Sequence, residues 1–265
     1  MTVVNERLVS QAILERWCEK FTNCLDLDVA VVGGGPSGML AAWKLAGRGY
    51  KVALFERKLS LGGGMWGGGM TYNFIVVQDA GRRLLDELGV PTRPYGEGYH
   101  TADAVTATTT LASKACLAGT QVFNCLSVED VVLREEGGVK RVAGLVVNST
   151  PVEMTGLHVD PLVVHCRAVI EATGHAVEVL KTLVRKNGVS LNTPCGGIAG
   201  EQSMWADKAE ADTLENTREI FPGIWVTGMA ANASFGSYRM GPIFGGMLLS
   251  GEKVAEDIAA RLGAH

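Results

Sequence analysis

The sequence predicts an α/β fold with a central parallel sheet and an additional small β-sheet. Three observations predict it. An apolar run at 28–33 passes directly into a glycine-rich turn, a helical pattern follows over 39–46, and a second apolar run over 51–55 ends at Glu56. Short apolar runs rich in β-branched residues, joined through a helix, are typical of buried parallel strands.

The whole chain, residues 1–265, is expected to form a single domain because it contains no repeat, low-complexity linker or charge block. Its expected parts are an N-terminal helical region at 1–27, a βαβ nucleotide-binding unit at 28–60, inserted loops and strands at 61–165, and return strands with a final helix at 166–265. Apolar residues at helical spacing over 7–21 predict a helix that packs against the rest of the molecule. The run GGGMWGGGM at 62–70 is too rich in glycine for a helix or strand and predicts a loop.

The same patterns predict the remaining elements. Helices are expected at 81–88, 108–118 and 245–262. Strands are expected at 121–125, 127–133, 141–147, 162–172 and 223–228. The sequence Glu-Glu-Gly-Gly at 135–138 indicates a hairpin turn between two of these strands.

The hexapeptide Gly33-x-Gly35-x-x-Gly38 fits the fingerprint of Rossmann-like dinucleotide-binding folds. The first glycine allows a tight turn, the second lets a pyrophosphate approach the backbone, and the third lets helix and strand pack closely. Glu56 follows at the end of the next strand, where a carboxylate can accept hydrogen bonds from an adenosine ribose. Arg57 suits a 2′-phosphate, but Glu56 repels one, so NAD or FAD is expected over NADP. The alternative to dinucleotide binding is that these glycines form a turn with a purely structural role.

The segments Ala-Thr-Gly-His175 and Val-Thr-Gly228 resemble the return elements of two-dinucleotide-binding flavoproteins, and we expect a fold of that type. In those proteins the final strand usually ends in Gly-Asp, and the aspartate reaches the ribityl chain of the flavin. Here Met229 follows Gly228, and a thioether is a weak hydrogen-bond acceptor. A flavin-dependent oxidoreductase is therefore an alternative that this residue weakens.

Two histidines and an aspartate are candidate metal ligands. His158 and Asp160 are two residues apart, so in an extended segment their side chains leave the same face, and His175 follows an apolar strand. Imidazole and carboxylate ligands suit a divalent transition metal, iron among them. A histidine and an aspartate in a loop are also commonly hydrogen-bonded structural residues, and spacing alone leaves both interpretations open. His100 and His165 have no partner in sequence and are expected to be structural.

A second glycine-rich loop, at 234–246, carries one cation, Arg239. A guanidinium there suits bidentate binding of a small carboxylate, and a surface arginine is the alternative. Cys195, in Pro-Cys-Gly-Gly, is a candidate nucleophile. A lone cysteine without an evident base is more often a small apolar residue, which is the interpretation we favour.

The composition excludes several classes of protein. The 34 glycines, well above the usual share of about 7%, lie in clusters without a fixed period, which excludes collagen. A net charge of −4 argues against nucleic acid as a partner, since that binding needs a basic face. No apolar run is long enough for a membrane span or a signal peptide, so a cytoplasmic location is expected. Six cysteines without CxxC spacing indicate reduced thiols.

Taken together, GGGPSG, Glu56-Arg57, LGGGMWGGGM, LHVDP, ATGH and GSYRMGPIFGGM resemble, in order and over nearly the whole chain, the thiamine thiazole synthase family. The resemblance implies an enzyme that builds the thiazole half of thiamin from NAD, glycine and sulfur, and releases nicotinamide. Fungal and plant members carry, at the position of His158, a cysteine that gives up its sulfur, so each such protein acts once. With histidine at this position, the chain resembles the archaeal and bacterial branch of the family. Members of that branch take sulfide from solution and use Fe(II) over many turnovers.

The resemblance also implies residue roles. Asp160 and His175 would be the iron ligands, with Asp160 shared toward a neighbouring subunit of a ring-like homo-octamer, and His158 would take part in catalysis with them. Arg239 would hold the carboxylate of glycine. The residues implied to line the NAD-derived adenylate are Ser37, Glu56, Arg57, Gly64, Val128, His158, Val159, Asp160 and Met229. A non-catalytic sensor of NAD or metal is the second alternative.

Overall fold

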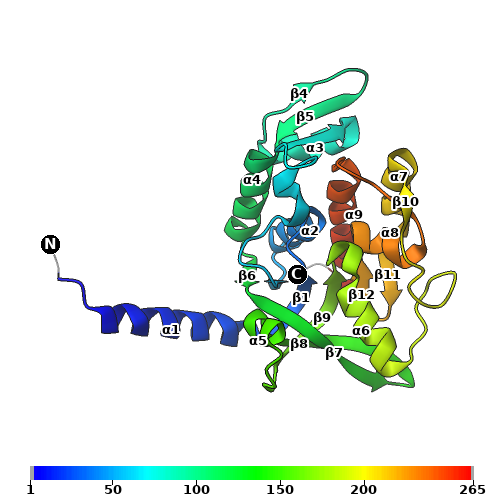
Figure 1. Ribbon diagram of the computed structural model, residues 1–265. Helices are drawn as coiled ribbons and strands as arrows, with labels where there is room; N and C mark the ends of the chain where they lie inside the picture. Colours follow the sequence, from blue (N-terminus) through cyan, green and yellow to red (C-terminus); the bar gives the residue numbers. More distant parts are fainter. Residues whose placement is uncertain (1–2, 264–265) are drawn as a thin grey trace.

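The computed structural model describes residues 3–263 and has a central eight-stranded sheet with helices on both of its faces (Figure 1). The strands of this sheet are β1 (Asp26–Val32), β2 (Val52–Glu56), β6 (Gln121–Asn124), β7 (Leu126–Glu136), β8 (Val139–Ser149), β9 (Leu162–Glu171), β11 (Arg218–Phe221) and β12 (Ile224–Val226). Their order is β11-β12-β9-β1-β2-β6, and the β7–β8 hairpin attaches through β8 to β9.

The pairing confirms the expected α/β fold of the Rossmann-like dinucleotide-binding kind. The neighbours of β1 are β2 and β9, and both pair with it in parallel, as do β6 with β2 and β12 with β9. Only β11 and the β7–β8 hairpin run antiparallel to their neighbours, so the central sheet is mixed rather than wholly parallel.

The helices are α1 (Glu6–Asn23), α2 (Pro36–Ala46), α3 (Asp79–Leu88), α4 (Ala104–Leu117), α5 (Thr150–Thr155), α6 (Glu178–Asn187), α7 (Ala206–Asn216), α8 (Met229–Phe235) and α9 (Gly245–Leu262), with 3-10 turns η1 (Gly63–Gly67) and η2 (Gly174–Ala176). The glycine run at 62–70 is a loop apart from η1, as expected. The predicted helices and strands all form, with ends that differ from the prediction by a few residues.

Alternating side chains of β1 supply both hydrophobic cores. Val29 and Val31 pack into a core with α2, α4 and α9, whereas Ala30 and Val32 face a second core that includes α6 and the β7–β8 hairpin. All four are at most 5% exposed. Because successive strand residues point to opposite faces, an uninterrupted apolar run is what a strand covered on both sides requires.

The packing role expected for the N-terminal helix is wrong over most of its length. α1 projects away from the body of the molecule (Figure 1), and Phe21 in its last turn is its only buried residue. Leu8, Ile13 and Leu14 are 54–66% exposed. Only two residues separate the end of α1 from the start of β1, which gives the helix no length of chain with which to fold back over the sheet.

Two small sheets accompany the central one. The first pairs β3 (Phe74–Gln78), β5 (Tyr99–Asp103) and β4 (Arg93–Pro94), and the second pairs β10 (Gln202–Met204) with β13 (Tyr238–Arg239). Within residues 3–263, no helix combines the length and apolar content needed to cross a bilayer. All six cysteines lie in the same range and are free thiols.

Glu210 of α7 links that helix to the start of α9. Its Oε2 accepts the backbone N–H of Gly246 at 2.7 Å, whereas Oε1 is buried without a hydrogen-bond partner in the described part of the chain. Burial raises the pKa of Glu210 to about 7, and the bond from Gly246 opposes that rise. The folded protein therefore favours the protonated carboxyl at a pH where the unfolded chain has already lost the proton.

We expect Glu210→Gln to raise the unfolding temperature at pH 8 and to lose that advantage near pH 5. The folded pKa lies above the ordinary value of 4.5, so wild-type stability falls as pH rises through the interval between the two values. A glutamine side chain keeps an acceptor for Gly246 and does not ionise. Thermal unfolding at both pH values measures this, with Glu215→Gln, exposed on the same helix, as control. The same pH dependence in Glu210→Gln and wild type would contradict the assignment.

Candidate active site

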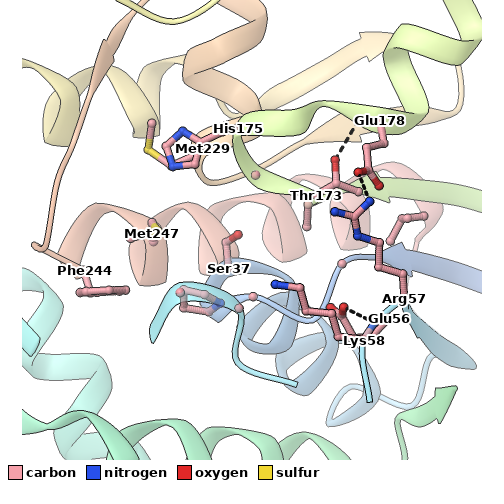
Figure 2. A pocket seen from close by; sticks show the side chains of 18 of the residues that line it. Ser37, Glu56, Arg57, Lys58, Thr173, His175, Glu178, Met229, Phe244 and Met247 are labelled. Atoms are coloured by element: carbon pink, nitrogen blue, oxygen red, sulfur yellow. Dashed lines mark hydrogen bonds and ion pairs between the residues drawn. The ribbon is translucent and has the colours of Figure 1, made fainter. Parts of the chain in front are cut away.

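A cavity of about 540 Å³ lies at the carboxyl ends of β1, β2 and β9 (Figure 2). Val32, Glu56 and Ala172 bring these strand ends to its wall. Because β1 has β2 on one side and β9 on the other, the strand order reverses here, and ligands of open α/β sheets bind at such a point. The volume is within the range of pockets that hold cofactor-sized ligands.

The three glycines of the fingerprint have the surroundings that their expected roles require. Gly33 has φ +101°, and a Cβ there would lie 2.4 Å from the carbonyl oxygen of Ala172. A Cβ on Gly38 would lie 2.2 Å from the carbonyl oxygen of Gly33. A Cβ on Gly35 would meet no atom within 4 Å. Gly35 thus leaves its backbone open to the cavity, in front of the N-terminus of α2.

Glu56 is buried at the end of β2 and reaches the cavity wall. Its Oε2 accepts the N–H of Gly34 at 2.8 Å, and its Oε1 accepts the N–H of Lys58 at the same distance. Each carboxylate oxygen can accept more than one hydrogen bond. The side chain therefore fixes the glycine turn and retains acceptor capacity for a ribose hydroxyl.

Arg57 and Glu178 form an ion pair across the cavity, with Nη1 2.5 Å from Oε1 (Figure 2). Burial raises the pKa of Glu178, and the Arg57 guanidinium opposes that rise. Glu178 is the first residue of α6, so the ion pair links the residue after β2 to the start of α6.

Glu171 is a fully buried carboxyl that shapes the segment before His175. It accepts N–H groups from Thr173 at 2.8 Å, Val179 at 2.8 Å and Leu180 at 3.3 Å. Burial raises its pKa, and these hydrogen bonds oppose the rise. The contacts tie the end of β9 to the first turn of α6.

His175 lines the cavity with its side chain half exposed, and its Nδ1 lies 2.5 Å from Oε2 of Glu201. Met229, the first residue of α8, also lines the cavity. In Figure 2 both lie above Ser37 and Phe244. The cavity thus has a histidine on the wall formed after β9 and an apolar contact from α8.

Two further cations reach the cavity. Arg239 belongs to the short strand β13, is exposed, and makes no ion pair with any residue in the range 3–263. Lys58 follows Glu56 and Arg57 along the chain. An unpaired guanidinium on the wall of a cavity is suited to a carboxylate ligand.

His158, Val159 and Asp160 do not line this cavity. They lie in the exposed segment between α5 and β9, where the carbonyl oxygen of Val159 accepts a hydrogen bond from Asn148 at 3.0 Å. Over residues 3–263, no three His, Cys, Asp or Glu side chains come together in a group able to hold a metal ion. One chain therefore brings His175 to the cavity but keeps Asp160 apart from it.

The expected site residues that line the cavity are Gly33, Gly35, Ser37, Glu56, Arg57, Gly64, Val128, His175, Met229 and Arg239. Gly38 packs behind it. Residues around the cavity that no sequence motif indicates are Lys58, Glu171, Glu178 and Glu201. Glu171 could have been found from the sequence, because it is an acidic residue at the end of an apolar strand. The contact of Glu201 with His175 has no such local sequence signal. Of the two histidines expected to be structural, His100 lies 2.7 Å from Asp79.

This geometry places the chain in the class of α/β proteins with a dinucleotide-binding fold. The model of the Thi4 family matches residues 10–244, and the chain belongs to that family. It is 71% identical over 259 residues to the thiamine thiazole synthase of Solidesulfovibrio magneticus, covering 98% of both chains. It is 59% identical to that of Methanothermobacter thermautotrophicus, covering 96% of this chain and 97% of the relative. The crystal structure of Thermovibrio ammonificans THI4 superimposes with a TM-score of 0.97 at 56% identity, covering 98% of this chain and 99% of that one.

We expect Glu56→Ala to weaken NAD binding by about 1.5–3 kcal/mol, or roughly 10- to 150-fold in Kd, because charge-assisted hydrogen bonds to the ribose are lost. Glu56→Gln keeps one acceptor oxygen and is expected to lose less. Titration calorimetry of both variants with NAD measures the effect, and Glu135→Ala on the exposed end of β7 serves as control. Wild-type affinity in Glu56→Ala would contradict the role given to the end of β2.

Proposed function

We propose that this chain is a thiamine thiazole synthase that makes ADP-5-ethyl-4-methylthiazole-2-carboxylate from NAD, glycine and sulfide with Fe(II), and releases nicotinamide. Its membership of the Thi4 family and the names of relatives 59–71% identical to it support the activity. The observation that carries the sulfide-dependent form is His158. An imidazole has no sulfur to give, so in this proposal the sulfur atom comes from sulfide in solution and not from residue 158.

In this proposal the glycine turn holds NAD. The pyrophosphate lies over Gly35 and the N-terminus of α2, where unpaired amides and the positive end of the helix dipole favour anions. The adenosine ribose hydrogen-bonds to Glu56, whose second acceptor positions are available. Water replaces nicotinamide at the ribose carbon, and the open-chain carbonyl form of the resulting ADP-ribose condenses with the amine of glycine to an imine, with release of water.

Arg239 holds the carboxylate of glycine and thereby places its amine beside the ribose carbon. A guanidinium binds a carboxylate through two parallel hydrogen bonds, and Arg239 has no competing acidic partner in the described chain. Proton transfers follow during tautomerisation. His158 is assigned to carry them, and because it lies outside the cavity of its own chain it would come, like Asp160, from a neighbouring copy.

In this proposal two subunits share the iron ion, because of its two proposed ligands one chain brings His175 but not Asp160 to the cavity. The Nδ1 atom of His175 is occupied by Glu201, which leaves Nε2 to bind a metal, and Asp160 would come from a neighbouring chain. A bound Fe(II), held by His175 and Asp160, would supply a coordination site for sulfide.

The exposed apolar residues next to Asp160 support a homo-oligomer, proposed here as an octamer. Leu157, Val159 and Leu162 are 49–63% exposed, and none of the three belongs to a hydrophobic core cluster of the described chain. Clusters of exposed apolar side chains mark surfaces that bind other proteins. A second copy of the chain that covers them would carry Asp160 with it.

The proposed reaction is tested by anaerobic incubation of the purified protein with NAD, glycine, Fe(II) and sulfide, followed by mass spectrometry of the small molecules. We expect product in excess of one equivalent per chain, no product without sulfide, and an unchanged protein mass. Product without sulfide that stops near one equivalent, with a protein lighter by the elements of hydrogen sulfide, would overturn the sulfide-dependent proposal. A purified protein with flavin absorbance would favour the oxidoreductase alternative, and NAD bound without being consumed would favour the sensor.

Sharing of the metal between subunits predicts complementation. Asp160→Ala and His175→Ala are each expected to lose Fe(II) binding and thiazole formation, because either change removes one of few protein ligands. Oligomers reassembled from equal amounts of the two variants should regain roughly a quarter of the wild-type sites, each with His175 from one chain and Asp160 from another. Iron bound per chain after anaerobic reconstitution measures this. Full iron occupancy in either single variant, or no recovery on mixing, would contradict the shared site.

A further inference from the structure

Glu201 contacts the proposed iron ligand His175 but belongs to none of the motifs of the sequence. Its Oε2 lies 2.5 Å from Nδ1 of the ring. A carboxylate accepts hydrogen bonds and donates none, so the contact requires the ring proton on Nδ1. The other ring nitrogen, Nε2, then carries the lone pair that a metal needs.

The backbone on both sides of Glu201 is fixed by hydrogen bonds. The N–H of Gly200 donates to Ala233 at 2.9 Å, and the N–H of Gln202 donates to Ser237 at 2.8 Å. These bonds attach the Glu201 segment to the end of α8 and the turn after it. The first residue of the same helix lines the cavity, so the carboxylate has a support that is part of the cavity wall.

The chain around His175 is fixed as well. Glu171 accepts the N–H of Thr173, the hydroxyl of Thr173 accepts the N–H of Glu178 at 2.9 Å, and the N–H of Val177 donates to Gly174 at 3.2 Å. These contacts hold the backbone but do not touch the imidazole. Among the described residues, the imidazole hydrogen-bonds to Glu201, which leaves this carboxylate to set the orientation of the ring.

We propose that Glu201 is a positioning residue that fixes the tautomer and orientation of His175 so that Nε2 is the metal-binding nitrogen. The inference rests on the proposed function, in which His175 binds iron. Histidine ligands of metals commonly donate their second ring N–H to a carboxylate, which orients the ring and makes the ligating nitrogen more basic. Glu201 forms no ion pair with a lysine or arginine of residues 3–263, so no cation competes with the imidazole for it.

The test is an anaerobic titration of the full-chain protein with Co(II), whose visible absorption reports the ligands around it. We expect Glu201→Ala to bind Co(II) about 10- to 100-fold more weakly than wild type. Glu201→Gln keeps an oxygen acceptor at the same place and should stay within a few-fold of wild type, with an unchanged spectrum at saturation. The control is Gln202→Ala, which removes a side-chain bond to Gly236 from the same segment and should leave the Co(II) affinity unchanged.

The outcomes separate the inference from the proposed function. Wild-type affinity in Glu201→Ala would overturn the positioning role and leave the proposed function standing. A loss in Glu201→Gln as large as in Glu201→Ala, with an altered spectrum, would make Glu201 a ligand and overturn the positioning role. A wild-type protein that binds no Co(II) would overturn both. Thermal unfolding of each variant identifies one that fails to fold, and Glu201→Gln, closest in shape to the native side chain, then decides.

Discussion

The close approach of the end of β1 to the end of β9 is the contact on which the rest of the structure depends. The N–H of Ala172 donates to the carbonyl oxygen of Val32 at 2.9 Å. At Gly33 the backbone that follows β1 lies so near the backbone that follows β9 that no side chain fits. Gly38 then packs α2 against the same turn. Because the strand ends meet without intervening side chains, the helix N-terminus and the segment that carries His175 open into one cavity.

Buried carboxylates stabilise the loops around that cavity. Glu56 ends β2 and accepts the N–H of Lys58, which follows it, and that of Gly34 in the turn after β1. Glu171 ends β9 and accepts the N–H of Thr173, which follows it, and that of Val179 in α6. A buried carboxyl is costly unless it is hydrogen-bonded, and here the bonds come from amides that would otherwise lack partners. The loops consequently hold their backbone dipoles in fixed orientations around the cavity.

The sequence predicted the parts of the molecule that depend on local patterns. The strand, glycine turn, helix and Glu56 were recognisable because each role has its own residue type within a short span. The contact between His175 and Glu201 was not, since it joins two loops that only the folded chain brings together. The apolar spacing of α1 predicted a helix correctly but not where its apolar face would lie, because periodicity reports amphipathicity and not the identity of the covering surface. Spacing alone left the metal site open, and the family resemblance implied that Asp160 reaches the site of a neighbouring subunit; one chain brings His175 but not Asp160 to the cavity.

The pairing of β1 with β9 has a consequence for synthesis of the chain. Asp28 and Arg167, which form an ion pair beside these strands, are 139 residues apart. A ribosome that adds about 5–20 residues per second needs roughly 7 to 28 seconds to produce β9 after β1. During this interval β1 can pair with β2 on one edge, but the backbone donors and acceptors on its other edge stay unpaired until β9 is made. An unpaired strand edge can pair with strands of other chains, so the nascent chain is prone to aggregation at this stage.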